Sequence, residues 1–253
     1  MRDIFQILVL ATVAFPAFAS GEYMLTPHTA EYKIKVSVLS GKLHTEFKAT
    51  DDGFNAHSVL RASGFAKLFV RGDVTESSTF DIVDNGVRPL QYSSDDRISK
   101  EDKSMAFDFD WQHSKVSGLI NHEDFNLDLQ GLVHDRVSIQ YQLMLDLLNN
   151  STSNEYVLID HKGIKALQIS NIGNKKIKVP FGEFEAIGIQ HRKQDSDRIT
   201  TLWCAEELGY LPVLIEQHRD GKLAVRAVLN KYQPIEADAS VIGSAAIHSA
   251  DHN

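Results

Sequence analysis

Cysteine, proline and long apolar runs are scarce in this chain of 253 residues. Cys204 is the only cysteine, so no internal disulfide can form and the apolar core must supply the stability of the fold. Only six prolines are present, and 43% of the residues are hydrophobic and 24% are charged. This composition is that of an ordinary globular protein.

Motifs of several enzyme classes are also missing. The sequence contains no HExxH zinc motif, no GxSxG nucleophile elbow, no phosphate-binding loop and no dinucleotide fingerprint. The body of the chain has no closely spaced pair of histidine ligands. We therefore expect no metal site, no cofactor and no catalytic residue.

Positive charge is in deficit. The chain carries 26 Lys and Arg against 34 Asp and Glu, which gives a net charge of −8. An acidic surface argues against nucleic acid or an anionic membrane as the main partner.

The N-terminus has the pattern of a secretory signal peptide. Arg2 provides a short basic start, an apolar run follows from Ile4 to Phe15, and the small-residue pattern Ala17-Phe18-Ala19 precedes the expected cut after Ala19. The apolar run is shorter than the roughly 20 residues of a spanning helix, so we expect no stable membrane span after cleavage. Export to the periplasm of a Gram-negative cell follows from this prediction.

Alternating apolar and polar residues dominate the remainder. The stretch AEYKIKVSV (Ala30–Val38) places every second apolar residue on one face, which predicts a half-buried strand. Turn signals separate many such stretches, and they are Asp51-Asp52-Gly53, Asp84-Asn85-Gly86, Gln112–Lys115, His161-Lys162-Gly163, Pro180-Phe181-Gly182 and Arg219-Asp220-Gly221. Short turns between strands predict an antiparallel meander.

One segment favours a helix instead. The second half of Asp135–Asn150 has the apolar spacing of an amphipathic helix, with Asp135 as its N-cap and Asn149-Asn150 as its stop, and an apolar strand is the alternative. A single helix cannot cover a wide sheet, so we predict a strongly curved antiparallel sheet or half-barrel with this helix on its concave side. Residues 20–233 form one β-rich domain in this prediction, and 234–253 form a disordered tail.

An ordered set of motifs resembles a known family. The set comprises GFAKLFVRGDVTESSTF, V-R-P-L-x-Y, FDFDW, HDRVS and LWCAEELGYLPVLIEQ, and it spans roughly Thr29 to Tyr232. It is similar to the bacterial secreted family catalogued as domain of unknown function 3108. The resemblance implies an envelope protein without established chemistry and, by analogy of fold, a likeness to curved-sheet carriers of lipids and lipoproteins.

Polar candidates for chemistry have simpler interpretations. Cys204 follows Trp203 at the end of an apparent strand and lacks a glycine-rich elbow, which favours a buried, inert thiol. Asp108 and Asp110 share one face of a strand, as the wet side of a half-buried strand would. An envelope hydrolase or isomerase that uses Asp108 and Asp110, or Asp135, remains an alternative hypothesis.

Aromatic residues are the stronger candidates for binding. The tentative ligand-binding set is Phe69, Phe80, Tyr92, Trp111, Tyr141, Trp203 and Tyr210. Together they favour an apolar groove for a hydrophobic or amphipathic component of the cell envelope, gated by the helix or by Gly64–Val70. A third alternative is a structural module whose exposed β edge pairs with another envelope protein.

Overall fold

The computed structural model describes residues 25–84, 86–99, 103–193 and 197–235. The predicted signal peptide and nearly all of the predicted tail lie outside these residues.

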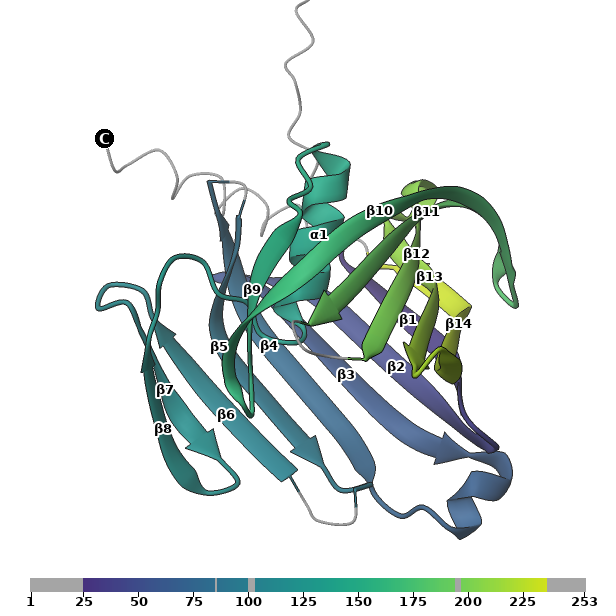
Figure 1. Cartoon of the computed structure of the whole chain (residues 1–253), viewed down its shortest axis with the longest axis horizontal. Helices are drawn as coiled ribbons and strands as arrows, with labels where there is room; N and C mark the ends of the chain where they lie inside the picture. Colours follow the sequence, from purple (N-terminus) through teal and green to yellow (C-terminus); the bar gives the residue numbers. More distant parts are fainter. Residues whose placement is uncertain (1–24, 85, 100–102, 194–196, 236–253) are drawn as a thin grey trace, which may run out of the picture.

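Two runs of antiparallel strands make up most of the structure (Figure 1). The first run consists of β1 (His28–Val36), β2 (Leu39–Thr50), β3 (Gly53–Ser63), β4 (Asp73–Val83), β5 (Gly86–Asp96), β6 (Lys103–Asp110), β7 (Lys115–Ile120) and β8 (Glu123–Asp128). The second run consists of β9 (Glu155–Asp160), β10 (Gly163–Val179), β11 (Gly182–Lys193), β12 (Arg198–Ala205), β13 (Leu211–Arg219) and β14 (Lys222–Pro234). All six predicted turns fall between consecutive strands, and Asn85 of the predicted Asp84-Asn85-Gly86 turn lies outside the described residues.

The strands form one 14-stranded sheet in the order β8-β7-β6-β5-β4-β3-β2-β1-β14-β13-β12-β11-β10-β9. The first and last strands of the chain therefore pair in the middle of the sheet, from His28 opposite Pro234 to Val36 opposite Val225. The edge strands β8 and β9 follow each other in sequence. Their connection must cross from one edge of the curved sheet to the other.

That connection contains the helix α1 (Ser138–Leu148), which confirms the predicted helix with slightly narrower bounds. Figure 1 shows α1 between the half of the sheet that contains β4–β8 and the half that contains β10–β14. Every residue from Ser138 to Leu147 is buried except Gln140. The helix is thus enclosed on nearly all sides, whereas an amphipathic helix would leave one face in water.

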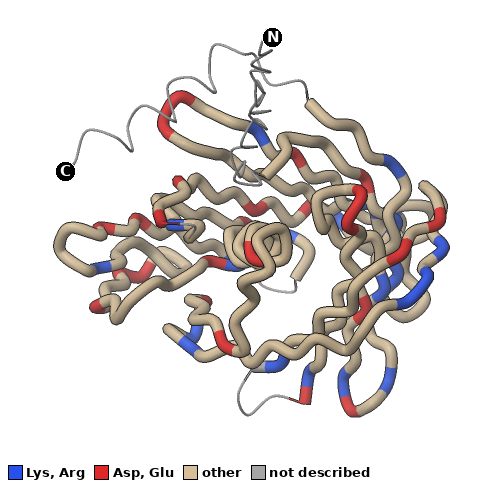
Figure 2. The backbone as a smooth tube through the Cα atoms, turned by 90° about the horizontal axis from the view of Figure 1, so that it is seen from above, with Lys and Arg blue, Asp and Glu red and all other residues tan. Residues whose placement is uncertain are grey.

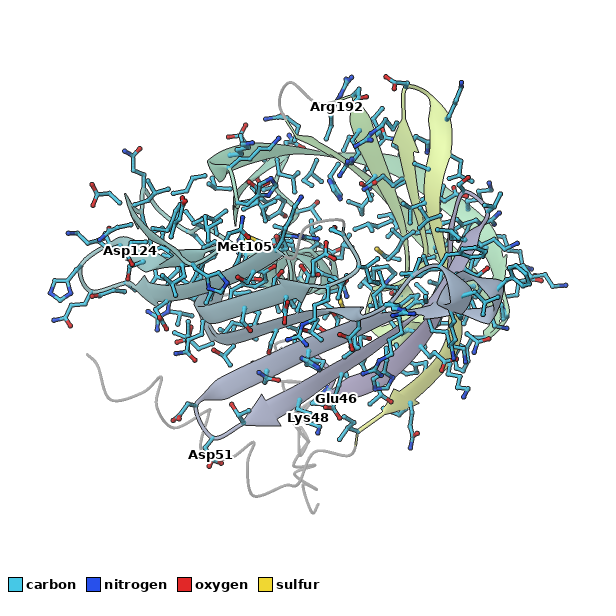
Figure 3. The ribbon with its side chains drawn as sticks, turned by 90° about the horizontal axis from the view of Figure 1, so that it is seen from below. Glu46, Lys48, Asp51, Met105, Asp124 and Arg192 are labelled. Carbon is cyan, nitrogen blue, oxygen red and sulfur yellow. The ribbon has the colours of Figure 1, made fainter. Side chains whose placement is uncertain are left out.

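Aromatic rings pack the space between α1 and the sheet. The ring centroids of Tyr141 and Phe47 are 4.4 Å apart, and those of Tyr141 and Phe80 are 5.3 Å apart. Phe47 and Phe80 are fully buried and also contact Phe54. In Figure 3 Met105, which belongs to a neighbouring apolar cluster, lies toward the inside of the molecule, while Asp51, Asp124 and Arg192 lie at the periphery. The concave face near α1 is therefore a filled core.

Side chains also fill the region between the two edges of the sheet. Residues of β5–β8, of β9 and of the start of β10 form one apolar cluster with the segment before α1. Ile159 and Val116 are fully buried in it, and Phe125 and Leu127 pack against it. The two edges thus meet through apolar contacts, which gives the open sheet the shape of a barrel.

Two short 3₁₀ helices interrupt the strands. The first, η1 (Gly64–Leu68), lies between β3 and β4, within the segment Gly64–Val70 that the sequence predicted as a possible gate. The second, η2 (Glu206–Leu208), makes the corner between β12 and β13 and ends at Gly209, whose φ of 64° suits glycine.

Candidate functional site

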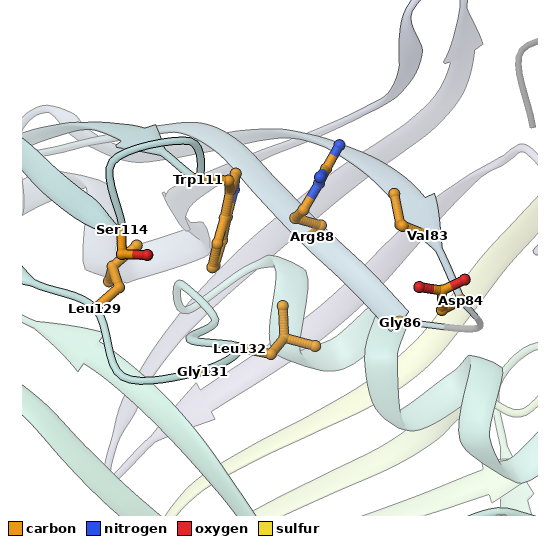
Figure 4. Close-up of a pocket in the computed structure, with 9 residues that line it drawn as sticks. All are labelled: Val83, Asp84, Gly86, Arg88, Trp111, Ser114, Leu129, Gly131 and Leu132. Carbon is orange, nitrogen blue, oxygen red and sulfur yellow. The ribbon is translucent and has the colours of Figure 1, made fainter. Parts of the chain in front are cut away.

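An apolar hollow opens where three loops meet at one end of the sheet (Figure 4). Its volume is about 380 Å³, and it lies between the β4–β5 turn, the β6–β7 turn and the segment that follows β8. Its lining consists of Val83, Asp84, Gly86, Arg88, Trp111, Ser114, Leu129, Gly131 and Leu132. This volume is at the lower end of the range for small-molecule pockets, roughly 300 to 1,000 Å³.

Trp111 forms one wall of the hollow. It directly follows β6, and its ring stacks on Phe109 with centroids 5.9 Å apart and an interplanar angle of 10°. The indole Nε1 donates a hydrogen bond of 2.6 Å to the carbonyl oxygen of Pro89 on β5. Because this bond satisfies the polar edge of the ring, the hollow is lined by its apolar surface.

Leu132 and Val83 expose large apolar side chains at the mouth of the hollow, each with 39% of its surface accessible. Gly86 separates them. A Cβ atom at Gly86 would lie 3.2 Å from Leu132 Cδ2 and 4.0 Å from Gln142 Oε1 on α1. The floor of the hollow is therefore close to the helix, and a side chain at position 86 would narrow it.

The segment between β8 and α1, which forms part of the lining, is held by backbone hydrogen bonds at two points. The backbone N–H of Leu129 donates to the carbonyl oxygen of Ser114 at 2.7 Å. The backbone of His134 exchanges hydrogen bonds with Val157 and Ile159 of β9. Gly131 and Leu132 lie between these two attachments, and Gly131 has a φ of 80°, a conformation that favours glycine.

The charged side chains of the hollow lie near its opening. Arg88 forms an ion pair with Asp81, with Nε 3.0 Å from Oδ1, and this hydrogen bond raises the pKa of Arg88. Asp84 adds a carboxylate in the β4–β5 turn. The arrangement is an apolar floor with one cation and two anions near the opening, which suits a molecule with an apolar body and a polar end.

Buried polar side chains attach α1 and its approach to the sheet. Asp135 accepts hydrogen bonds from the hydroxyl of Ser78 on β4 at 2.6 Å and from the backbone N–H groups of Val137 and Ser138. Asp135 therefore satisfies two N–H groups at the start of the helix, although the N-cap position predicted for Asp135 is held by Val137, two residues later. Burial raises the pKa of Asp135 to about 6, although these hydrogen bonds oppose the rise.

Further along α1, Gln142 accepts a hydrogen bond of 2.6 Å from the backbone N–H of Val87 and donates to Asp146 at 2.8 Å. Asp146 also accepts a hydrogen bond from the hydroxyl of Tyr156 on β9. Burial raises the pKa of Asp146. The helix is thus held to β4, β5 and β9 by hydrogen bonds as well as by packing.

The three carboxylates of the enzyme hypothesis are not brought together. On β6, Met105, Phe107 and Phe109 are buried, whereas Asp108 and Asp110 are exposed on the opposite face. Asp108 accepts a hydrogen bond from Gln91, and Asp110 pairs with His113. Asp135 is fully buried on the inner side of the sheet.

The single thiol is deeply buried. Cys204 is 3% exposed, and burial raises its pKa to about 12. The thiol of Cys204 thus stays protonated at neutral pH, which matches the expected inert role.

The predicted aromatic set is dispersed through the molecule. Phe80, Tyr92 and Tyr141 are buried, and Tyr92 donates a hydrogen bond to Glu76, which also pairs with Arg136. Of the seven, Trp111 lines the hollow described above.

The other three predicted aromatic residues lie elsewhere. Phe69 is 73% exposed just after η1. Lys175 Nζ lies 5.6 Å from the centroid of the Trp203 ring, and Tyr210 is half-buried against a separate apolar cluster. Sequence reasoning missed Val83, Leu129 and Leu132 because they come from three loops that only the fold brings together.

A second hollow of about 420 Å³ lies where β1, β2 and β14 meet the β10–β11 turn, lined by residues that include Glu31, His44, Phe181 and Tyr232. Glu31 accepts a hydrogen bond from Asn230, with Nδ2 2.7 Å from Glu31 Oε1, and it forms an ion pair with Lys42. The first hollow is the better candidate because its floor is apolar.

Other site types find little support in the described ranges. Within residues 25–84, 86–99, 103–193 and 197–235, no group of three or more His, Cys, Asp or Glu could hold a metal ion. No helix in the same ranges is long and apolar enough to cross a membrane.

Comparison with known proteins places the chain in a family. Residues 24–222 match the family described as a protein of unknown function, DUF3108. The chain belongs to that family. The resemblance seen in the sequence motifs is therefore confirmed, although no curated protein matches this family member.

A solved structure shares the fold. The beta-barrel-like protein of domain of unknown function DUF1849 from Brucella abortus is similar with a TM-score of 0.58 and 12% sequence identity. The match covers 85% of this chain and 100% of that chain. At this identity the likeness concerns the fold alone, and it supports the barrel-like description of the open sheet.

Proposed function

We propose that this chain is an exported, non-enzymatic protein of the bacterial envelope that binds a hydrophobic or amphipathic envelope component. The proposal rests on the hollow beside Trp111, which has an apolar floor and charged side chains near its opening. The remaining concave face of the sheet is filled by side chains. A lipid, a lipidated segment of a protein or a polymer intermediate has the required chemistry. Burial of its apolar part would supply the binding free energy.

The size of the hollow suggests how such a ligand is accommodated. A volume of about 380 Å³ suits a small amphiphile or part of a longer chain. A longer chain would need movement of Gly131 and Leu132, which lie between the attachments at Leu129 and His134. We infer that this short segment is the gate, and that α1 stays attached to the sheet.

The position of the carboxylates supports binding over catalysis. Asp108 and Asp110 face outward, while Asp135 is buried and hydrogen-bonded at the start of α1. A general acid and base must reach the same substrate. Asp108 and Asp110 share the outer face of β6 but are exposed and lie outside the lining of the hollow, and Asp135 is buried on the inner side of the sheet.

The proposal is tested by titrating the protein with fluorescent fatty acids of increasing chain length. Each added methylene is worth about 0.8 kcal/mol when fully buried, so affinity should rise by about fourfold per carbon and level off once the hollow is full. Trp111→Ala and Leu132→Asp should weaken binding by at least about tenfold, since each removes apolar surface from the lining.

Leu119→Asp is the matched control, because Leu119 is a similarly exposed leucine (43%) on β7 outside the lining of the hollow. Circular dichroism establishes that each variant is folded. Folded Trp111 and Leu132 variants that bind the probes as tightly as the Leu119 variant would rule out this hollow as the binding site.

A further inference from the structure

Large apolar side chains project into solvent at the end of the sheet that carries η1. We call the following set the apolar rim: Val36, Val38, Leu39, Phe65, Leu68 and Phe69. Four of its members are mostly exposed, with accessible fractions of 92% for Val38, 78% for Phe65, 70% for Leu68 and 73% for Phe69. An exposed cluster of this kind is typical of an interaction surface.

The members of the rim are neighbours in the fold. Val36 pairs with Leu39 across the β1–β2 turn, and Ser40 pairs with Ser63, the residue before η1. The short helix η1 contacts β2 and β3, and the rings of Phe65 and Phe69 have centroids 6.0 Å apart. Figure 1 shows η1 as the short helical turn at the lower right, beyond the end of the strands.

Leu223 extends the rim on the other side. Val225 on β14 pairs with Val36, so Leu223 lies toward the same end of the sheet as Val38, and it is 48% exposed.

The exposure of η1 is set by its backbone. Ala66 is the only buried residue of η1, and its carbonyl oxygen accepts hydrogen bonds from the N–H groups of Phe69 and Val70. Gly72 closes the loop with a φ of 86°, and a Cβ atom there would lie 2.7 Å from the carbonyl oxygen of Arg97. The smallest apolar side chain of the loop therefore faces the protein, and the largest ones face outward.

Basic residues surround the rim. Lys35, Lys67, Arg71 and Lys222 are all exposed there. In the fully described turns 37–38, 64–72 and 220–221, Asp220 is the only acidic residue. Figure 2 shows Lys and Arg interspersed with Asp and Glu along the backbone. Asp73, directly after this loop, is paired with Arg61, so the four exposed basic residues leave the rim locally cationic although the net charge of the chain is −8.

We propose that the apolar rim docks this protein on the surface of an anionic lipid bilayer. Phe65, Leu68, Phe69 and Val38 would enter the boundary between headgroups and acyl chains, while the surrounding lysines and arginine contact anionic headgroups. The apolar residues lie at the tips of adjacent turns, a convex shape that a deformable bilayer can accept. The charge of the rim selects anionic over neutral lipid, contrary to what the net charge of the sequence predicts.

Vesicle flotation tests the proposal with two compositions, pure phosphatidylcholine and phosphatidylcholine with about one third phosphatidylglycerol. The protein should float with the anionic vesicles, bind the neutral ones at least about tenfold more weakly, and dissociate as salt rises. The variant Phe65→Ser/Leu68→Ser/Phe69→Ser should lose at least about tenfold in affinity, as should Lys35→Glu/Lys67→Glu/Arg71→Glu.

The matched control is Leu119→Ser/Ile172→Ser, which removes apolar side chains that are exposed far from the rim, at 43% and 45%. All variants share one N-terminus, so any contribution of the apolar residues 4–15 is common to them. A Phe69→Trp variant adds a local readout, because its emission should shift to the blue with anionic vesicles only.

Three results would overturn the proposal. The first is equal flotation of the rim variants and the control. The second is equal, salt-insensitive binding to both vesicle types. The third is a concentration-dependent dimer that the serine variant abolishes in the absence of any vesicle binding, since the rim would then join two copies of the chain. Binding of fatty-acid probes beside Trp111 is measured separately, so either proposal can fail alone.

Discussion

The region around α1 and the apolar rim use the same residue types in opposite ways. Around α1, Phe47, Phe80 and Tyr141 stack on one another and are almost completely buried. At the rim, Phe65 and Phe69 lie 6.0 Å apart with more than 70% of each side chain in solvent.

The difference shows that the apolar content of the chain is divided between folding and interaction. The region around α1 is closed by packing and by the buried hydrogen bonds of Asp135, Gln142 and Asp146. At the rim, the turn that carries the phenylalanines is held by Ala66 and by glycines. Substitutions should therefore affect stability in the first region and binding in the second.

The largest effect is expected in the core. Phe80→Ala should lower the free energy of unfolding by about 3 to 5 kcal/mol, because it leaves a cavity among Phe47, Phe54 and Tyr141. Urea denaturation followed by circular dichroism measures the change. A loss below about 1 kcal/mol would mean that this region is not a filled core.

Two neighbouring buried residues should oppose each other in the pH dependence of stability. The pKa of Asp135 is raised from 3.8 to about 6 in the folded state. Between about pH 4 and pH 6 the folded state therefore holds a proton that the unfolded state has released. The contribution of Asp135 to the free energy of unfolding falls as the pH rises through this window. Burial lowers the pKa of His134 from 6.5 to about 4, so the unfolded state holds the extra proton and stability rises across nearly the same window.

Substituting one of the two residues should expose the contribution of the other. The measured quantity is the free energy of unfolding of each variant minus that of the unmodified chain. From pH 4 to pH 6 this difference should rise for Asp135→Asn and fall for His134→Leu, each by up to about 3 kcal/mol for a pKa change of about two. Denaturant unfolding at several pH values measures both slopes. If the stability difference changed in the same direction with pH for both variants, one of these two groups could not be buried.

A smaller effect is expected from the attachment of α1 to β5. Gln142→Ala removes the acceptor of the Val87 N–H and should cost about 1 to 3 kcal/mol, because a buried donor loses its partner. Gln140→Ala is the control, since Gln140 is half-buried on the same helix. Equal unfolding midpoints for the two variants would show that the bond to Val87 does not hold the helix.

The smallest effect on stability belongs to the rim. Phe65→Ala should change the free energy of unfolding by no more than about 0.5 kcal/mol, as an exposed substitution away from the core does. The same denaturation experiment measures it. A loss above about 2 kcal/mol would place Phe65 in a buried contact and remove the contrast with Phe80.

The sequence predicted much of the fold because strand alternation and turn chemistry are local. The Asp51-Asp52-Gly53 and Arg219-Asp220-Gly221 turns lie where expected, and Asp135 accepts a hydrogen bond from the N–H of Val137 at the start of α1. The pairing of β1 with β14 and the burial of α1 on nearly all sides depend on contacts between distant segments. Periodicity within one segment carries no information about either.

The candidate site was less predictable for the same reason. Trp111 could be singled out as an aromatic residue, but Val83, Leu129 and Leu132 are ordinary apolar residues until three loops converge. The sequence pattern predicted a gate at Gly64–Val70, but it did not reveal that Ala66 is the only buried residue of η1. Gly64 and Gly72, both with positive φ, bound the loop that exposes the rest.

Native mass spectrometry of the protein recovered from the cell envelope tests the central claim most directly. If the hollow beside Trp111 holds an amphipathic component, the spectrum should show one chain with an added mass that organic solvent removes, and Trp111→Ala should diminish that species. A ligand-free mass, together with failure of the purified protein to take up any fatty-acid probe, would contradict the proposed function.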